Sequence, residues 1–131
     1  MTTPSDRRYT PEHQWIRVES ASRCLIGVTD FAQSQLGEIS FVDVPATGSA
    51  VRAGEPFGTI ESLKAASDLF APVSGEIVGV NGEAGESPER INDDPYGVWL
   101  IAIAPSDPGM VETLLTADQY DALVAPTAGF E

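Results

Sequence analysis

Lys64 is the only lysine in this 131-residue chain, and the other six basic residues are arginines. The lysine amine can be acylated to form an amide, whereas arginine cannot usefully be modified in this way. A single side-chain amine leaves a modifying enzyme no competing lysine. Composition bias toward arginine also explains the scarcity, although it does not explain why one lysine is retained. Lys64 is therefore a candidate for covalent attachment of an acyl group.

The sequence around Lys64 indicates a hairpin connection. Residues 61–68 (ESLKAASD) lie between strand-like runs that contain Phe57 on one side and Leu69 on the other. A side chain at such a tip points into solvent while the strands hold its position, so a long attached group could sweep a wide volume. Glu61 and Asp68 flank the lysine. They are either recognition marks for a modifying enzyme or ordinary turn residues.

The other reactive residue types form no catalytic or metal-binding pattern. His13 is the only histidine, so a metal site would lack a second imidazole, and a structural hydrogen bond is the favoured role. Cys24 is the only cysteine and lies in an apolar run, which indicates a buried side chain. Ser62 and Ser67 lack partner residues for nucleophilic catalysis and are expected to serve the turn. We predict no metal site and no catalytic residue.

Short β-rich runs separated by Gly, Pro and Asn dominate the first hundred residues. This pattern is typical of an antiparallel sandwich or barrel. The predicted strands cover residues 15–19, 23–28, 38–44, 57–61, 68–71, 76–80 and 98–104. The chain length suits one compact domain, with about residues 9–124 structured and flexible tails.

Helices are expected at two places. Asp30 and Gln33 fit a capping box for a short internal helix over residues 31–36, which Gly37 would end. Apolar residues recur at helical spacing after Pro105, and Thr116 with Gln119 fits a second capping box, so C-terminal helices should pack on the sheet. We expect residues 83–95 to form a long polar loop and residues 126–131 a frayed tail.

Charge and composition restrict the partners. Twenty acidic residues against seven basic ones give a formal charge of −13, which would repel nucleic-acid phosphates and anionic membranes. The acidic surface either keeps the protein soluble or steers it onto basic surfaces of its partners. No apolar run is long enough to cross a bilayer, and the start of the chain has no signal-peptide core. We expect a cytoplasmic monomer, or a mitochondrial matrix protein if the chain is a processed eukaryotic form.

Several blocks of the sequence resemble the glycine cleavage system H protein family. The block around Lys64 continues into residues 71–76 (APVSGE) in the manner of the lipoylation region of that family. Further blocks are similar in the family's order, over about residues 9–124: residues 9–15 (YTPEHQW), 27–33 (GVTDFAQ), 36–38 (LGE) and 92–97 (NDDPYG). The combination is highly specific for this family.

The resemblance implies a mainly β fold, a barrel-sandwich hybrid of the lipoyl/biotinyl-domain type, with lipoate in amide linkage to Lys64. It also implies a carrier without catalytic activity. In the family, the arm takes an aminomethyl group from glycine at the glycine decarboxylase (P protein) and delivers it to the aminomethyltransferase (T protein). Dihydrolipoyl dehydrogenase (L protein) reoxidises the arm. A lipoyl- or octanoyl-transferring enzyme would load the lysine.

In this family a cleft shields the loaded arm from water. The resemblance maps its docking residues to Gln14, Gln35 and Asp68. Gln14 stands where the family usually has Glu, so a charged contact to the bound amine would become a neutral hydrogen bond. Asp68 keeps a carboxylate for a cationic adduct.

Other interpretations remain open from the residues alone. Carrier domains of biotin carboxylases and of 2-oxoacid dehydrogenases also place a modified lysine on a hairpin. Biotin acceptors typically have Met on both sides of this lysine, where this chain has Leu63 and Ala65. An H-like scaffold or interaction protein that is never lipoylated is the main alternative. A free-standing enzyme lacks a recognisable set of catalytic residues.

Overall fold

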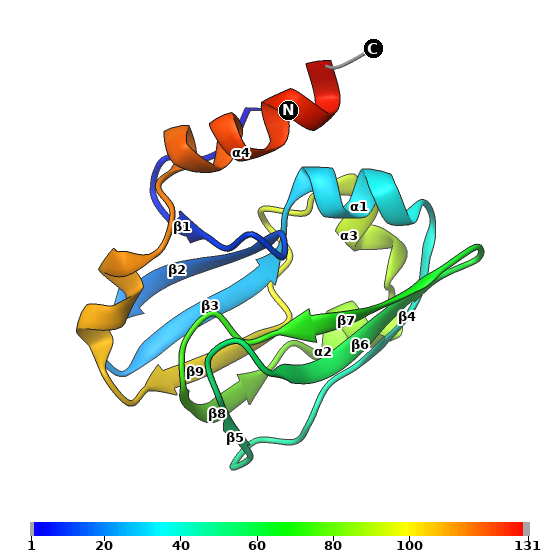
Figure 1. The fold of residues 1–131 in the computed structure, drawn as a ribbon. Helices are drawn as coiled ribbons and strands as arrows, with labels where there is room; N and C mark the ends of the chain where they lie inside the picture. The colour runs from blue at the N-terminus through cyan, green and yellow to red at the C-terminus, as the bar shows by residue number, and fades with distance from the viewer. Residues whose placement is uncertain (1, 130–131) are drawn as a thin grey trace.

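Two antiparallel β-sheets face each other in the computed structural model, which describes the backbone of residues 2–129 and the side chains through residue 124 (Figure 1). The larger sheet has six strands in the order β1-β2-β3-β9-β8-β5, and the smaller has three in the order β4-β6-β7. The strands are β1 (Arg8–Tyr9), β2 (Gln14–Ser20), β3 (Arg23–Val28), β4 (Ile39–Asp43), β5 (Ala50–Val51), β6 (Pro56–Ser62), β7 (Ala66–Phe70), β8 (Gly75–Val80) and β9 (Ile101–Pro105). Each of the seven predicted strands is present, and the barrel-sandwich fold class is confirmed. The two-residue strands β1 and β5 were not predicted.

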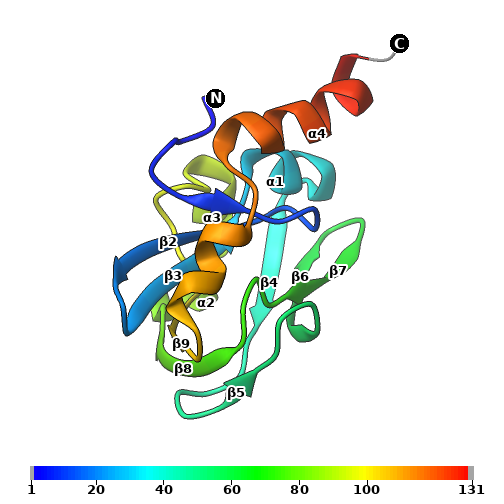
Figure 2. The same ribbon diagram turned by 60° about the vertical axis from the view of Figure 1, so that its left-hand side comes forward.

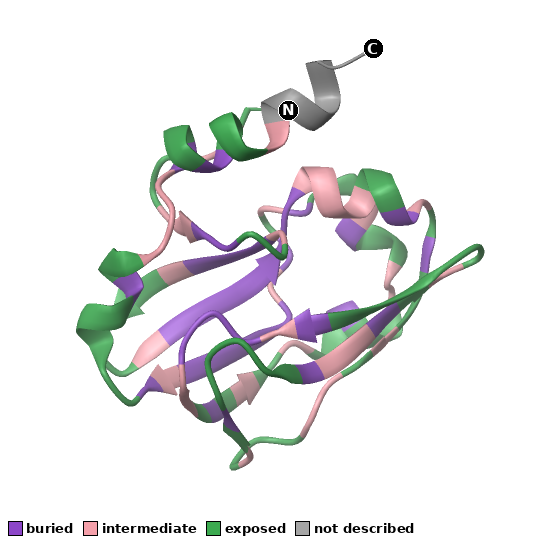
Figure 3. Cartoon of the chain, in the orientation of Figure 1, coloured by how far each residue is buried: buried purple, intermediate pink, exposed green. Residues whose placement is uncertain are grey.

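The core lies between the two sheets. Ile26 and Ile101 from the larger sheet and Ile60 and Leu69 from the smaller one belong to one cluster of fully buried side chains. Cys24 is part of the same cluster, as predicted from its apolar surroundings. Figure 3 shows buried residues in strands of both sheets, while the projecting end of the β6–β7 hairpin is mostly exposed. Burial of the inner faces therefore fixes the register of the strands that carry Lys64.

Helix α1 (Asp30–Leu36) occupies the expected place, but its cap differs from the prediction. Thr29 is the N-cap, and its hydroxyl accepts a hydrogen bond from the Ala32 amide at 3.2 Å. Asp30 is already in the first turn, and its carboxylate accepts a hydrogen bond from the side chain of Gln33. The pairing of Asp30 with Gln33 was correctly predicted, whereas the assignment of Asp30 as the cap was wrong by one residue. Gly37 ends the helix with φ of 85°.

Two short helices replace the long loop that was predicted for residues 83–95. They are α2 (Gly82–Glu86) and α3 (Glu89–Asp93). The side chain of Asn81 caps α2, and each helix buries one apolar side chain, Ala84 in α2 and Ile91 in α3. Both helices contact β4, so they cover one margin of the smaller sheet.

The C-terminal part is helical as predicted, with a 3₁₀ segment η1 (Pro108–Thr113) followed by α4 (Ala117–Gly129). The capping box is present: the Thr116 amide donates to Gln119 Oε1 at 2.9 Å, and the Gln119 amide donates to Thr116 Oγ1 at 3.2 Å. The helix continues through Pro126 to Gly129, where a frayed tail was predicted, and residues 130–131 lie outside the described chain. None of the described helices is long and apolar enough to span a membrane.

Helix α4 lies outside the sandwich, on the side of the molecule that carries α1 (Figures 1 and 2). A second apolar cluster joins it to the larger sheet and includes Tyr9, Trp15 and Tyr120. Residue Leu115, just before the helix, exchanges two backbone hydrogen bonds with Tyr9 of β1, at 2.9 and 3.0 Å. The helix is therefore attached to the barrel-sandwich through β1 and this cluster.

The contact between Trp15 and Gly27 yields a stability prediction. A methyl group at Gly27 would lie 2.5 Å from Cζ2 of the buried Trp15 ring. Gly27→Ala should therefore lower the free energy of unfolding by about 1–3 kcal/mol, as overpacked cores do. Gly85→Ala in α2 is the control, because nothing lies within 4 Å of its new methyl group. It should be neutral or stabilising by up to about 1 kcal/mol. Urea denaturation measures both, and equal effects would contradict the predicted clash.

Candidate functional site

Lys64 lies at the tip of the β6–β7 hairpin, in a turn that Ser62 organises. The Ser62 amide donates to the carbonyl of Ala65 at 2.8 Å, and the Ala65 amide donates to the Ser62 hydroxyl at 3.1 Å. The amide of Lys64 lies 3.4 Å from the same hydroxyl. A side-chain oxygen thus accepts hydrogen bonds at the turn, as in other serine-stabilised turns. Ser62 serves the turn as predicted, and it holds the backbone on both sides of the lysine.

The side chain of Lys64 is exposed and remains unpaired by any acidic group in the described part of the chain. Leu63 beside it is 76% exposed, so the tip makes little contribution to the core. The aliphatic part of Lys64 lies across Gly37, at the end of α1: a methyl group built at Gly37 would be 3.2 Å from Lys64 Cε. The bare backbone of Gly37 therefore leaves room for the lysine stem.

Asn92 of α3 fixes the neighbourhood of Gly37. Its Nδ2 donates to the Gly37 carbonyl at 2.8 Å and to Gln33 Oε1 at 2.9 Å, while its Oδ1 accepts from the Ile39 amide at 2.9 Å. One side chain thus ties the end of α1 to the start of β4. This role was not predicted, although Asn92 lies in one of the blocks quoted for the family resemblance.

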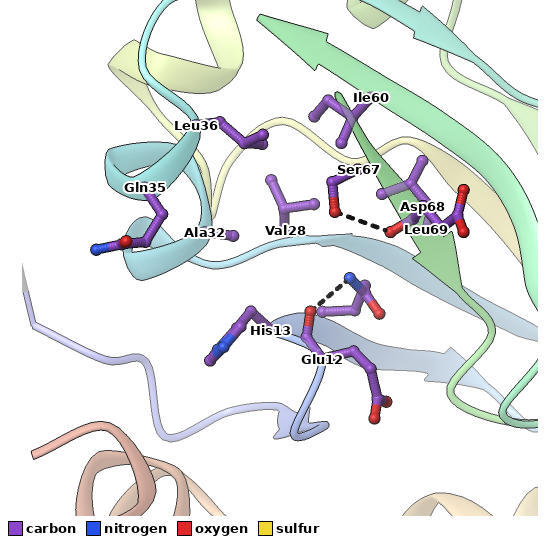
Figure 4. A pocket seen from close by; sticks show the side chains of 11 residues that line it. Glu12, His13, Val28, Ala32, Gln35, Leu36, Ile60, Ser67, Asp68 and Leu69 are labelled. Atoms are coloured by element: carbon purple, nitrogen blue, oxygen red, sulfur yellow. Dashed lines mark hydrogen bonds between the residues drawn. The ribbon is translucent and has the colours of Figure 1, made fainter. Parts of the chain in front are cut away.

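A pocket of about 150 Å³ opens beside the hairpin, between α1, β7 and the turn that precedes β2 (Figure 4). The apolar part of its lining consists of Val28, Ala32, Leu36, Ile60 and Leu69. Its polar residues come from three elements: Glu12, His13 and Gln14 from the turn and the start of β2, Gln35 from α1, and Ser67 and Asp68 from β7. The structure therefore brings Gln14, Gln35 and Asp68 together, as the resemblance implied. Glu61 does not line this pocket.

Gln14 is 3% exposed, and only one of the two polar atoms of its side-chain amide has a hydrogen-bond partner in the described structure. Its Nε2 donates to the carbonyl of Glu12 at 2.8 Å, which Figure 4 shows as a dashed line. Its Oε1 has no hydrogen-bond partner. A buried oxygen without a partner is costly, so its position in a pocket wall favours a ligand that donates a hydrogen bond. Glu12, which was not among the predicted docking residues, adds a carboxylate beside it.

His13 adopts a left-handed backbone conformation with φ of 71°, the only such non-glycine residue in the described chain. Its Nδ1 lies 2.8 Å from the hydroxyl of Tyr120, and its ring contacts Phe31 with centroids 4.7 Å apart. Burial lowers the pKa of His13, which leaves the ring neutral at pH 7, and it raises the pKa of Tyr120 to about 12, so the phenol stays protonated. The predicted structural hydrogen bond of His13 is thus present. No group of three or more metal-ligand side chains gathers in the residues described.

Fold and site together define the class of protein: a carrier domain of the lipoyl/biotinyl type, with one lysine on an exposed hairpin tip. The family model described as "Glycine cleavage H-protein" matches residues 7–127. The chain therefore belongs to the glycine cleavage H-protein family.

The sequences of related proteins match this chain over nearly its whole length. A glycine cleavage system H protein of Burkholderia ambifaria is 50% identical over 121 residues, which cover 92% of this chain and 96% of the relative. One of Geobacillus thermodenitrificans is 50% identical over 125 residues, covering 95% and 98%. A crystal structure of a glycine cleavage system H protein from Mycobacterium marinum has a TM-score of 0.85 and 41% identity, covering 97% of this chain and 99% of that one. The chain is a carrier component of the glycine cleavage system and not an enzyme.

The half-buried imidazole of His13 makes stability depend on pH. Because burial lowers the pKa of His13 from its usual 6.5, the unfolded chain binds this proton more tightly than the folded chain does. The stability that comes from a neutral His13 is therefore complete above about pH 6.5 and decreases as the pH falls through the folded pKa.

His13→Asn tests this dependence, because asparagine tolerates positive φ and does not titrate. The stability advantage of the unsubstituted chain over His13→Asn should shrink between about pH 7.5 and pH 5.5. Urea denaturation across this range measures it, and His13 is the only histidine that could contribute. A difference that stays constant with pH would contradict the prediction.

Proposed function

We propose that Lys64 carries lipoate in amide linkage and that the pocket beside the hairpin holds the loaded arm between partner enzymes. The observation that supports this most directly is the position of the single lysine, exposed on a Ser62-organised turn next to that pocket. Bound lipoate supplies a disulfide that can accept an aminomethyl group and be regenerated by oxidation.

The residues present suit such a group. An alkyl chain needs an apolar surface, and the pocket walls offer Val28, Leu36 and Leu69 among others. The path from the lysine to the pocket passes the end of α1, where Gly37 has no side chain to obstruct the stem. The arm can thus be exposed for delivery or rest against apolar residues that exclude water.

The polar residues of the pocket suit a cationic amine at the end of the arm. Asp68 on β7 and Glu12 in the turn before β2 both line the pocket and carry exposed carboxylates, and Gln14 has an amide oxygen that lacks a partner. Charge-assisted hydrogen bonds to a carboxylate are stronger than neutral ones. We infer that Asp68 and Glu12 provide the charge and that Gln14 orients the group, while Gln35 lies at the α1 side of the pocket.

The partners follow from the family. We propose that the arm receives an aminomethyl group at the glycine decarboxylase (P protein), passes it to the aminomethyltransferase (T protein) and is reoxidised by dihydrolipoyl dehydrogenase (L protein). Glu61 lies outside the pocket and is exposed on β6, so it is available to the lipoyl- or octanoyl-transferring enzyme. We place these encounters in the cytoplasm.

Replacing Lys64 tests the attachment site. Lys64→Arg should abolish lipoylation and carrier activity, because arginine offers no acylable amine. Its effect on the free energy of unfolding should stay within about 0.5 kcal/mol, as for other exposed residues. Intact mass spectrometry after expression in lipoate-sufficient cells detects the attached group, and glycine decarboxylation with the partner enzymes reports activity. An unmodified but folded parent chain would favour the scaffold alternative.

Asp68 and Glu61, two carboxylates of the same hairpin, allow a test of whether the pocket stabilises the bound aminomethyl group. Asp68→Asn should speed the loss of the aminomethyl group from the loaded carrier about 1.4- to fivefold, since exposed charge pairs contribute about 0.2–1 kcal/mol. Glu61→Gln is the matched control: it removes an exposed carboxylate that lies outside the pocket, and it should leave this rate unchanged. Ammonia or formaldehyde release from the isolated loaded carrier measures the rate. Equal rates in the two variants would show that Asp68 does not contact the bound group.

A further inference from the structure

We propose that Tyr120 of α4 is a positioning residue of the arm-docking pocket: its hydroxyl holds His13 and the Thr29 cap of α1 in the arrangement that forms two walls of the pocket. This inference rests on the proposed function. It assigns to the C-terminal helix a part in a site to which it contributes no lining residue.

The hydroxyl of Tyr120 joins two elements of the pocket. It lies 2.8 Å from His13 Nδ1 and 2.7 Å from Thr29 Oγ1. Thr29 Oγ1 already accepts the Ala32 amide, so its own proton is available for the phenol oxygen. The phenol proton then goes to Nδ1 of the neutral His13. All three polar groups are satisfied when Thr29 donates to Tyr120 and Tyr120 donates to His13.

The turn that this hydroxyl holds is strained. His13 has a positive φ, which costs a non-glycine residue free energy and persists only when its surroundings enforce it. The backbone supplies two of these restraints: the His13 amide donates to the Thr10 carbonyl at 3.0 Å, and the His13 carbonyl accepts from the Thr29 amide at 3.1 Å. Tyr120 and Phe31 restrain the ring. Release of the ring would allow the turn to relax.

Relaxation of this turn would disturb the pocket directly. Glu12, His13 and Gln14 are consecutive in the chain, and each of them lines the pocket. The hydrogen bond from Gln14 to the Glu12 carbonyl spans the same turn. A change in the backbone at His13 would therefore move Glu12 and Gln14, the two residues of this turn that are proposed to contact the amine of the loaded arm. The position of the Glu12 carboxylate and the Gln14 amide therefore depends on a side chain from α4.

Packing alone does not require a hydroxyl at position 120. Tyr120 is 2% exposed and its ring stacks on Tyr9 with centroids 5.0 Å apart, a contact that phenylalanine would keep. Tyr9 is equally buried, but its hydroxyl donates to the carbonyl of Pro4, away from the pocket. Tyr9 and Tyr120 thus form a matched pair: the same residue type in one stack, with one hydroxyl directed to the pocket turn and one to the N-terminal segment.

The experiment compares Tyr120→Phe with Tyr9→Phe. In the unmodified chain, exchange of the hydrogen-bonded amides of His13 and Gln14 and the ring nitrogen shifts of His13 report the state of the turn. Tyr120→Phe should speed exchange there about fivefold, the change expected from loss of the hydrogen bond to His13, and should shift the Nδ1 resonance. Tyr9→Phe should change neither. In the loaded carrier, only Tyr120→Phe should speed the loss of the aminomethyl group.

The outcomes separate the inference from the proposed function. Unchanged exchange and Nδ1 shift in Tyr120→Phe, or equal changes in both variants, would overturn the role of the hydroxyl. A faster-exchanging turn with an unchanged rate of aminomethyl loss would also overturn it, because Tyr120 would then stabilise the turn without serving the pocket. If lipoate is absent from Lys64 in the parent chain, the proposed function fails, whereas the exchange and shift measurements, which need no lipoate, still decide the effect of Tyr120 on the turn.

Discussion

The three side-chain hydrogen bonds of Asn92 connect the end of α1 to the start of β4, and the position of the lysine hairpin depends on this junction. They satisfy the Gly37 carbonyl at the end of α1 and the Ile39 amide at the start of β4, two backbone groups that neither element can pair within itself. Gly37 can then take its positive φ and bring β4 against the β6–β7 hairpin, where the Leu63 amide approaches the Glu38 carbonyl. The lysine stem lies on this junction. A rigid base under an exposed tip is what a long covalent arm requires, because the arm itself has no fixed position.

The sequence predicted the strands well because Gly and Pro punctuate them and apolar residues mark their buried faces. It also predicted the exposed position of Lys64 between two paired strands, whereas attachment of an acyl group to this lysine remains a proposal. The helices α2 and α3 were missed because each has a single turn and one buried apolar residue, too little for a helical period to appear. Asn81 and Gly82, which follow the predicted strand over residues 76–80, are a helix cap and the first helical residue. Side chains of Ser, Thr, Asn and Asp stabilise turns and caps alike, so local sequence does not separate the two.

The pocket could be predicted only in part, for a different reason. The family resemblance supplied Gln14, Gln35 and Asp68, but the residues themselves contain no sign that a turn, a helix and an edge strand converge. Convergence depends on the left-handed conformation of His13 and on the contact of its ring with Tyr120, more than a hundred residues away in the chain. Glu12 was missed because its place in the pocket follows from that conformation. Contacts at such sequence separation leave no local pattern.

The neutral residue at position 14 is consistent with the geometry around it. Gln14 is almost fully buried, and its Nε2 donates the hydrogen bond that closes the turn onto the Glu12 carbonyl. An ionised glutamate could not donate this bond, and burial near the carboxylates of Glu12 and Asp68 would raise its pKa and favour the proton. A glutamine avoids that cost and leaves one buried oxygen without a protein partner. The charge that attracts a cation then comes from Glu12 and Asp68, which water can solvate while the pocket is empty. This chain therefore separates two tasks: the buried residue shapes the turn, and the carboxylates at the rim supply the charge.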